Sequence, residues 1–256
     1  MKLFYKQYGQ EGKPLFILHG IFGMLDNWHN IAKQLSEQGF MVFTIDARNH
    51  GQSPHSDEMS YQLMAEDVIE LADDLGFETF ILMGHSMGGK TAMWTANQFG
   101  NRLEKLILVD IAPKTYNAGH LTYFDAFEQI PWNTLSSRKE IDEALMEYES
   151  NMGVRLFLAK NIDRNENGSF SVKCNIKAIK KAYTEIISEL HFDSIFNQPT
   201  FFLLGENSRY LKEEDKPSIL QYFPSSVFMN VSNAGHWVHA DNPKEFLEKL
   251  IGFIQS

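Results

Sequence analysis

Short runs of almost wholly apolar residues alternate with segments of helical periodicity along most of this chain. Runs of this kind, without polar alternation, are typical of parallel strands that are buried on both faces. The predicted strands comprise residues 15–18, 41–45, 79–83, 105–109, 200–204 and 227–231. Amphipathic helices are predicted between or after them, at residues 28–35, 63–75 and 243–254. This order of elements predicts an α/β fold whose sheet is mostly parallel and doubly wound.

The alternation is interrupted by one long segment between the fourth and the fifth predicted strand. No buried strand is predicted there; residues 176–190 have the spacing of an amphipathic helix, and residues 164–168 indicate a turn. The segment is too long for one crossover connection, which favours a helical cap over extra helices packed on the sheet. We expect residues 1–112 and 198–256 to form the core and residues 113–197 to form the cap. Such a cap would cover the carboxyl ends of the strands, where open α/β sheets bind ligands.

Composition narrows the classes of function. The chain has 23 Lys and Arg residues against 33 Asp and Glu residues, which gives a formal net charge of −10. An acidic surface repels phosphate backbones, so no nucleic-acid partner is expected. No signal peptide and no membrane span are expected, because no apolar run approaches the roughly 18 residues that a span needs. The single cysteine, Cys174, fits a reducing compartment, and we expect a cytoplasmic protein that acts on a small molecule. The oligomeric state is left open.

Residues 84–88 read Gly-His-Ser-Met-Gly and have the form G-x-S-x-G, directly after a predicted strand and before a predicted helix. This setting is typical of a nucleophile elbow, a tight turn with no room for side chains on either side of the serine. The helix N-terminus behind Ser86 favours developing negative charge. We predict that Ser86 is a catalytic nucleophile, the alternative being an ordinary glycine-rich turn. His85, beside it, is expected to point elsewhere.

A serine hydroxyl is a poor nucleophile near neutral pH and needs a general base. His236 lies in a loop after the last predicted strand, at the same edge of the sheet as Ser86, and it is the predicted base. His239, near the start of the last predicted helix, is the second candidate.

An acid must fix the tautomer of the imidazole and stabilise its charged form. This acid commonly follows the strand predicted at residues 200–204, but Ser208 stands at that position. Asp110 ends the preceding strand at the same sheet edge and is the predicted acid, with Glu206 and Asp215 as the alternatives. The order of nucleophile, acid and base along the chain then agrees with the order expected for an elbow of this type.

An oxyanion hole needs two backbone N–H donors. Met87, the residue after the nucleophile, is predicted to supply one of them. Residues 19–23, His-Gly-Ile-Phe-Gly, follow the first predicted strand, and Ile21 is the predicted second donor, with Phe22 next. His19 is expected to have a structural role.

Large apolar side chains are the candidates for the wall of a substrate pocket. If they line the site, short to medium acyl chains fit better than large polar groups. The alternative is that those in the cap form its core, which helical spacing does not exclude. The candidates are Phe22 and Trp237 in loops, with Phe124, Phe127, Trp132, Leu156 and Phe157 in the cap.

Several blocks of the chain, in their order and spacing, resemble the α/β-hydrolase superfamily, and within it the YbfF-type bacterial esterases. The main blocks are residues 19–23, 46–53, 84–89 and 235–237. The resemblance implies an α/β-hydrolase fold and the hydrolysis of carboxylic esters without a metal or an organic cofactor. It also implies an acid after the sixth strand of the family's fold, which corresponds to the strand predicted here at residues 105–109, and this agrees with Asp110. Arg48 and His50 in the second block are expected to hold loops together.

The predicted function is therefore hydrolysis of short- to medium-chain acyl esters by Ser86, His236 and Asp110 through an acyl-enzyme. One alternative is an acyl-CoA thioesterase with the same triad, because acyl-transfer chemistry does not distinguish sulfur from oxygen. Its CoA would need clustered cations, for which the candidates are Lys177, Lys180 and Lys181, unless these form one solvated helix face. Another alternative is a hydrolase fold that only binds its ligand.

Overall fold

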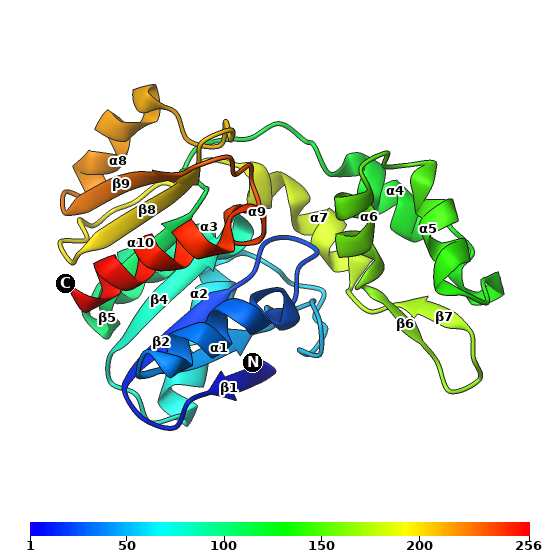
Figure 1. The fold of residues 1–256 in the computed structure, drawn as a ribbon, viewed down its shortest axis with the longest axis horizontal. Helices are drawn as coiled ribbons and strands as arrows, with labels where there is room; N and C mark the ends of the chain where they lie inside the picture. The colour runs from blue at the N-terminus through cyan, green and yellow to red at the C-terminus, as the bar shows by residue number, and fades with distance from the viewer.

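The computed structural model describes residues 1–256 and is built around a sheet of seven strands (Figure 1). The strands are β1 (Tyr5–Tyr8), β2 (Lys13–Leu18), β3 (Phe40–Ile45), β4 (Phe80–His85), β5 (Leu103–Val109), β8 (Thr200–Gly205) and β9 (Ser226–Val231). Their spatial order is β1-β3-β2-β4-β5-β8-β9. Only β1 is antiparallel to its neighbour; the other pairs are parallel.

The predicted α/β fold with a mostly parallel sheet is confirmed, and each predicted strand overlaps an observed one. The apolar runs miss β1, because its residues are half-buried or exposed and mostly polar. Leu18 pairs with Gly84, and Gly84 pairs with Leu108. The loops that follow β2, β4 and β5 therefore leave the sheet at one edge, where the candidate site is assembled.

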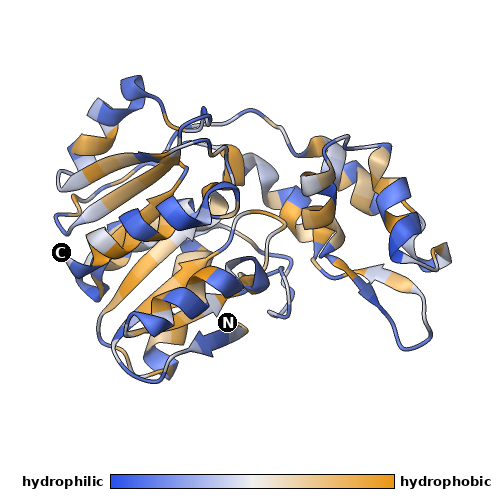
Figure 2. Ribbon diagram, viewed as in Figure 1, coloured by the Kyte–Doolittle hydropathy of each residue, from blue (hydrophilic) through white to orange (hydrophobic).

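Helices cover both faces of the sheet, and Figure 2 shows apolar strands between helices whose outer sides are polar. One face is covered by α1 (His29–Glu37) and α10 (Pro243–Gln255). The other face is covered by α2 (Tyr61–Asp74), α3 (Met87–Phe99) and α8 (Lys216–Tyr222). Successive residues of a strand such as β2 contribute to opposite cores, which explains why its run has no polar alternation.

Local sequence signals account for several helix ends. Ser60 precedes α2, and its Oγ accepts a hydrogen bond from the Leu63 N–H, as an N-cap residue does. Pro243 is the first residue of α10, where its fixed φ fits and no N–H is needed. Gly39 and Gly76 follow α1 and α2 with φ of +86° and +77°, a left-handed conformation that favours glycine.

The long segment between β5 and β8 contains helices and one small hairpin, most of which lie to one side of the sheet (Figure 1). Its elements are α4 (Leu121–Gln129), α5 (Arg138–Met146), α6 (Met152–Ala159), β6 (Ile162–Arg164), β7 (Phe170–Val172) and α7 (Ile176–Ile187). The segment has no strand that is buried throughout, as expected, but it does contain this hairpin, whose three-residue strands are too short to leave an apolar run. Its turn falls at residues 164–168, where a turn is predicted.

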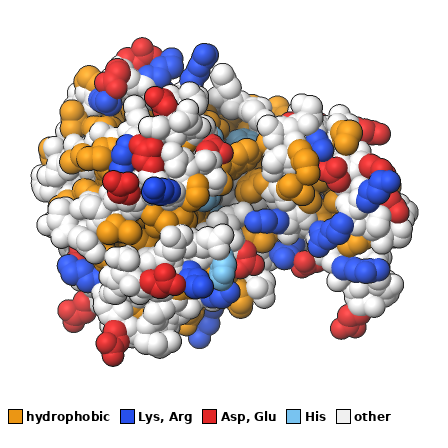
Figure 3. Space-filling view, in the orientation of Figure 1, with side chains coloured by type: hydrophobic (Ala, Val, Ile, Leu, Met, Phe, Trp, Pro, Cys, Tyr) orange, Lys and Arg blue, Asp and Glu red, His pale blue; other side chains and the backbone are white.

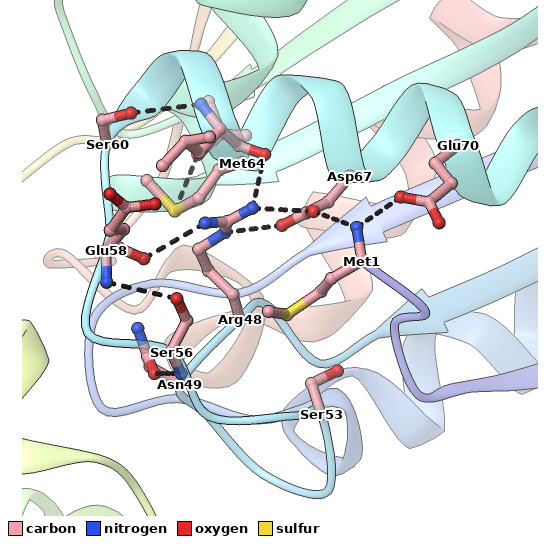
Figure 4. A network of polar contacts seen from close by, with 12 residues as sticks. Met1, Arg48, Asn49, Ser53, Ser56, Glu58, Ser60, Met64, Asp67 and Glu70 are labelled. Carbon is pink, nitrogen blue, oxygen red and sulfur yellow. Dashed lines mark hydrogen bonds and ion pairs between the residues drawn. The ribbon is translucent and has the colours of Figure 1, made fainter.

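Arg48, in the loop after β3, ties that loop to α2 (Figure 4). Its guanidinium donates to both carboxylate oxygens of the buried Asp67, from Nε at 2.6 Å and from Nη2 at 2.8 Å. It also donates to the backbone carbonyls of Glu58 and Leu63. The amino group of Met1 is a further donor to Asp67. Arg48 thus holds loops together, as expected.

We expect Arg48→Met to lower the free energy of unfolding by about 3 kcal/mol, because it leaves the Asp67 carboxylate buried without its main partner. Urea unfolding at neutral pH would measure this loss. Lys139→Met, which removes an exposed ion pair with Glu143, is the control and should leave the midpoint almost unchanged. Equal effects of the two substitutions would contradict this account of the Arg48 contacts.

Candidate active site

Ser86 stands at the turn between β4 and α3 with φ of +53° and ψ of −117°, an unusual conformation for a residue other than glycine. The turn is tight on both sides. A Cβ on Gly84 would lie 2.1 Å from the Gly88 carbonyl oxygen, and a Cβ on Gly88 would lie 2.6 Å from the His19 carbonyl oxygen. Only glycine fits at these two positions. The turn therefore has the strained strand-to-helix geometry of a nucleophile elbow, with Ser86 at the N-terminus of α3.

Asp110 and His236 are directly paired. The His236 Nδ1–H donates to Asp110 Oδ2 at 2.7 Å. Asp110 follows β5 with φ of +50° and is fully buried, and its Oδ1 accepts from the Gly205 N–H at 3.1 Å. His236 comes from the loop after β9 and is half-buried. The Nδ1 contact leaves Nε2 as the ring nitrogen that is available for proton transfer.

Two neighbours hold the His236 ring and its loop in place. The Tyr210 ring stacks on the His236 ring, with centroids 3.7 Å apart and planes at 11°. His85 Nε2 lies 2.9 Å from the His236 carbonyl oxygen, so the His85 N–H donates to that carbonyl. His85 therefore contacts the loop of the candidate base and lines the same cavity, which corrects the expectation that it points elsewhere.

The structure places the alternative acids away from His236, and it gives the alternative base no carboxylate partner. Glu206 is exposed and accepts from the Asn233 N–H, and Asp215 is paired with Lys114 at 2.5 Å. His239 stacks on Trp28 with ring centroids 4.0 Å apart and has no carboxylate partner. Burial lowers the pKa of His239 to about 3, so its ring is neutral near neutral pH.

Ser208 occupies the position at which the acid is more commonly found, and it contacts the candidate acid, Asp110. The Ser208 hydroxyl donates to Asp110 Oδ2 at 2.5 Å. Asp110 thus accepts three hydrogen bonds, from Ser208, His236 and the Gly205 N–H. Hydrogen bonds to a buried carboxylate stabilise its charged form, which is the form that orients an imidazolium.

The candidate oxyanion donors flank Ser86. Met87 is the first residue of α3, so its N–H has no partner within the helix. Ile21 lies in the loop after β2 and lines the cavity beside Ser86. Both residues are buried. The backbone of the Ile21 loop and the start of α3 are therefore neighbours at the nucleophile, as an oxyanion hole requires.

Phe22 links the candidate oxyanion loop to the segment between β5 and β8. Its φ is +59°, and its carbonyl oxygen accepts from Asn161 Nδ2 at 2.7 Å. Its ring packs against Phe124 and Phe127, with centroid distances of 5.0 and 5.3 Å. Asn161 is fully buried, and nothing in its local sequence indicates this contact, since the two partners lie 139 positions apart.

A cavity of about 540 Å³ opens at Ser86 and His236, between the sheet and the segment that follows β5. Figure 3 shows this hollow, with hydrophobic side chains along the side formed by the helical segment. Phe22 and Trp237 line the cavity, as predicted, and so do Leu156, Phe157 and Lys160 from α6 and the residue after it. The wall is therefore largely apolar, with one cation among the residues of the helical segment.

Phe124 and Phe127 do not line this cavity, which corrects their prediction as pocket residues. Both are buried on the inner face of α4, where they pack on Phe22. Trp132 is likewise buried, and its Nε1–H donates to the Phe127 carbonyl. These aromatic residues form the core of the helical segment, the alternative that helical spacing leaves open.

Burial keeps other histidines at the site neutral. It lowers the pKa of His19 to about 4, and it lowers the pKa of His85 well below the usual value. His19 Nε2 accepts from the Ala47 N–H, which fits a structural role. No three His, Cys, Asp or Glu side chains come together in the arrangement of a metal site. No helix has the length and apolar character required to cross a membrane.

Comparison with known proteins places the chain in a family. The profile of the family described as "alpha/beta hydrolase fold" matches residues 13–243. The sn-1-specific diacylglycerol lipase ABHD11 of Danio rerio is 38% identical over 256 residues, which cover 96% of this chain and 79% of the relative. Esterase YbfF of Escherichia coli K12 is 29% identical over 245 residues, which cover 95% and 94% of the two chains.

A solved structure, an esterase from a marine microorganism, has a TM-score of 0.95 and 41% identity to this chain, and the match covers 98% of this chain and 99% of the other. The chain belongs to the α/β-hydrolase fold family. Within that family, these similar proteins are esterases and lipases.

Proposed function

We propose that this enzyme hydrolyses carboxylic esters of short to medium acyl chain length, with Ser86 as nucleophile, His236 as general base and acid, and Asp110 as the orienting acid. The observation that carries the proposal is the 2.7 Å contact of His236 with Asp110 beside a cavity that Ser86 also lines. The esterase and lipase relatives support the same class of reaction.

The first half of the reaction forms an acyl-enzyme. His236 Nε2 takes the proton of the Ser86 hydroxyl as Oγ attacks the ester carbonyl carbon. The N–H groups of Ile21 and Met87 donate to the oxyanion of the tetrahedral intermediate. The His236 imidazolium, oriented by Asp110, then gives its proton to the leaving alcohol oxygen as the carbon–oxygen bond breaks.

The second half of the reaction releases the acid. A water molecule gives a proton to His236 Nε2 and attacks the acyl carbonyl carbon, and the same backbone N–H groups stabilise the new oxyanion. The ester bond to Ser86 then breaks, and His236 returns the proton to the serine oxygen. The products are one carboxylic acid and one alcohol, and the enzyme is unchanged.

We further propose that residues 113–197 act as a cap over this site. Support comes from the cavity wall, to which Leu156, Phe157 and Lys160 contribute. The Asn161 contact with the Phe22 carbonyl supports a fixed position of the cap over the oxyanion loop. A cap at the carboxyl ends of the strands shields the acyl-enzyme and shapes the substrate site.

The cation arrangement favours oxygen esters over CoA thioesters. Lys177, Lys180 and Lys181 are absent from the wall of the cavity, and Lys180 is paired with Glu128 at 2.6 Å. A CoA pocket would need clustered, unpaired cations at the cavity rim. These lysines instead fit a solvated helix face.

A fluorophosphonate probe tests the proposed nucleophile directly. We expect one adduct, located on Ser86 by peptide mass spectrometry, together with hydrolysis of p-nitrophenyl butyrate. Butyryl-CoA, assayed in parallel, should be cleaved more slowly. Absence of both the adduct and the hydrolysis would point instead to a fold that only binds its ligand, and faster cleavage of butyryl-CoA would make the thioester the preferred substrate.

Ser208→Ala should lower kcat for p-nitrophenyl butyrate roughly 10-fold, because Asp110 loses one of its three hydrogen bonds while its contact with His236 remains. The change in KM should be small, since Ser208 is not part of the cavity wall. Ser225→Ala, which removes an exposed hydroxyl that donates to the Asn197 carbonyl, is the matched control. An unchanged kcat in the Ser208 variant would show that this hydroxyl is dispensable for orienting the acid.

A further inference from the structure

Two cavities meet at Ser86, and they differ in size and in lining. The large lobe is the cavity of about 540 Å³ described above, and the small lobe is a second cavity of about 60 Å³. The two lobes share Ile21, Ser86, Gly119, His120 and Tyr210. His236 lines the large lobe and is absent from the wall of the small lobe. A substrate bound at Ser86 therefore has two unequal spaces for its two halves.

The position of His236 assigns each half of an ester to one lobe. The general acid must reach the leaving oxygen, so the alcohol half of the ester has to lie on the His236 side. That side is the large lobe. Met87, the predicted oxyanion donor after the nucleophile, lines the small lobe. With the oxyanion at Ile21 and Met87 and the leaving oxygen at His236, the acyl chain is left with the small lobe.

The small lobe is mostly apolar, and two of the tyrosine hydroxyls in its wall are bonded to backbone carbonyls. Ile111, Ile186 and Ile187 contribute to its wall. The Tyr61 hydroxyl donates to the Ile186 carbonyl at 2.7 Å, and the Tyr116 hydroxyl donates to the Tyr210 carbonyl at 2.9 Å. These two hydroxyls therefore do not require a polar partner on the part of the substrate that enters.

The wall of the small lobe is also anchored, which limits how far it can expand. The buried Lys90, four residues after Ser86, donates from Nζ to the carbonyls of Lys114 and Ser188, at 2.9 and 2.5 Å. These two carbonyls belong to the two stretches of chain that enter and leave the segment of α4 to α7. One water molecule needs roughly 10–15 Å³ by the same measure, so a lobe of about 60 Å³ holds about four to six small groups.

We propose that this enzyme selects esters by the distribution of their bulk: a short acyl group of about two to six carbons in the small lobe, and a large apolar alcohol in the large lobe. The proposal rests on the proposed function, because it uses His236 as the general acid. It narrows that function to one substrate class, short-chain carboxylic esters of bulky apolar alcohols.

Two isomeric esters test this assignment, because they differ only in which side carries the long chain. Octyl acetate has the chain on the alcohol, and ethyl octanoate has it on the acyl group. We expect kcat/KM for octyl acetate to be at least about 30-fold higher, in the range that a few misplaced methylene groups produce. Equal values, or a preference for ethyl octanoate, would overturn the assignment.

Substitution of one wall residue provides the matched variants. Ile187→Ala, in the small lobe, should raise kcat/KM for ethyl octanoate about 10-fold relative to octyl acetate. Leu156→Ala, in the wall of the large lobe, should not change the ranking of acyl chain lengths. If Ile187→Ala does not fold, Ile186→Val should produce a smaller shift in the same direction, and no shift in either variant overturns the assignment.

The outcomes also separate this inference from the proposed function. Cleavage that favours ethyl octanoate, together with a fluorophosphonate adduct on Ser86, would support the proposed triad. It would contradict the assignment of the acyl group to the small lobe. No cleavage of either isomer and no adduct would reject the proposed function, and with it the lobe assignment.

Discussion

Ser86→Ala is expected to lower kcat for p-nitrophenyl butyrate by about 10⁶-fold, the largest effect of any single substitution in this chain. Without the hydroxyl, no acyl-enzyme can form, and His236 has no nucleophile to deprotonate. What remains should be the weak catalysis that oxyanion donors and substrate binding give to water attack. Steady-state assays on extensively purified protein would measure the loss, because traces of wild-type enzyme would otherwise dominate.

The fold should tolerate this change. Alanine must adopt the φ of +53° that Ser86 has, so a modest loss of stability is expected and circular dichroism should report unchanged secondary structure. The Ser225→Ala variant controls for loss of a serine hydroxyl elsewhere. Activity close to the wild-type level in Ser86→Ala would contradict the proposed mechanism, since no other residue stands at an elbow of this kind.

Asp110→Asn should lower kcat by about 10⁴-fold, less than the loss of the nucleophile. The amide has nearly the shape of the carboxylate but cannot stabilise an imidazolium, and an amide NH₂ facing His236 Nδ1 favours the wrong tautomer. The Gly205 N–H, which donates to Asp110 Oδ1, still finds an acceptor in the amide oxygen, and the Ser208 hydroxyl, which contacts Oδ2, can turn to accept from the amide NH₂. The His236 ring should therefore stay close to its present position but lose its ability to act as general base and acid.

Two parallel substitutions show whether the acid is correctly assigned. Glu206→Gln and Asp215→Asn remove the alternative carboxylates, which contact Asn233 and Lys114 and not His236. We expect both variants to retain kcat within about threefold of wild type. A loss in either one that matches Asp110→Asn, measured with the same ester, would move the role of the acid to that residue.

The sheet could be predicted from sequence because its parallel strands are buried on both faces and leave unbroken apolar runs. The strands that could not be predicted lack this signal. β1 lies at the edge of the sheet with mostly polar residues, and β6 and β7, of three residues each, form a hairpin outside it. β1 is positioned by its pairing with β3, whereas β6 and β7 pair with each other, and none of the three leaves an apolar run in the sequence.

The placement of Ser86, Asp110 and His236 at one edge of the sheet could also be predicted, because each follows the carboxyl end of a parallel strand. The cavity wall could not. The helical spacing of Phe124 and Phe127 predicts that both lie on the buried face of their helix. That face of α4 packs in the core of the helical segment and does not face the cavity. Contacts of this kind are set by tertiary packing, and a single sequence carries no local signal for them.

The Asn161 contact has a consequence for anyone who would exchange caps between enzymes of this family. A graft that replaces residues 113–197 removes the amide that donates to the Phe22 carbonyl and the aromatic rings around the Phe22 side chain. The recipient then keeps its serine, its histidine and its aspartate but loses the support of a backbone turn held at positive φ. In this molecule the proposed cap is therefore not an interchangeable module for specificity, because a transplanted segment has to supply its own support for the proposed oxyanion loop.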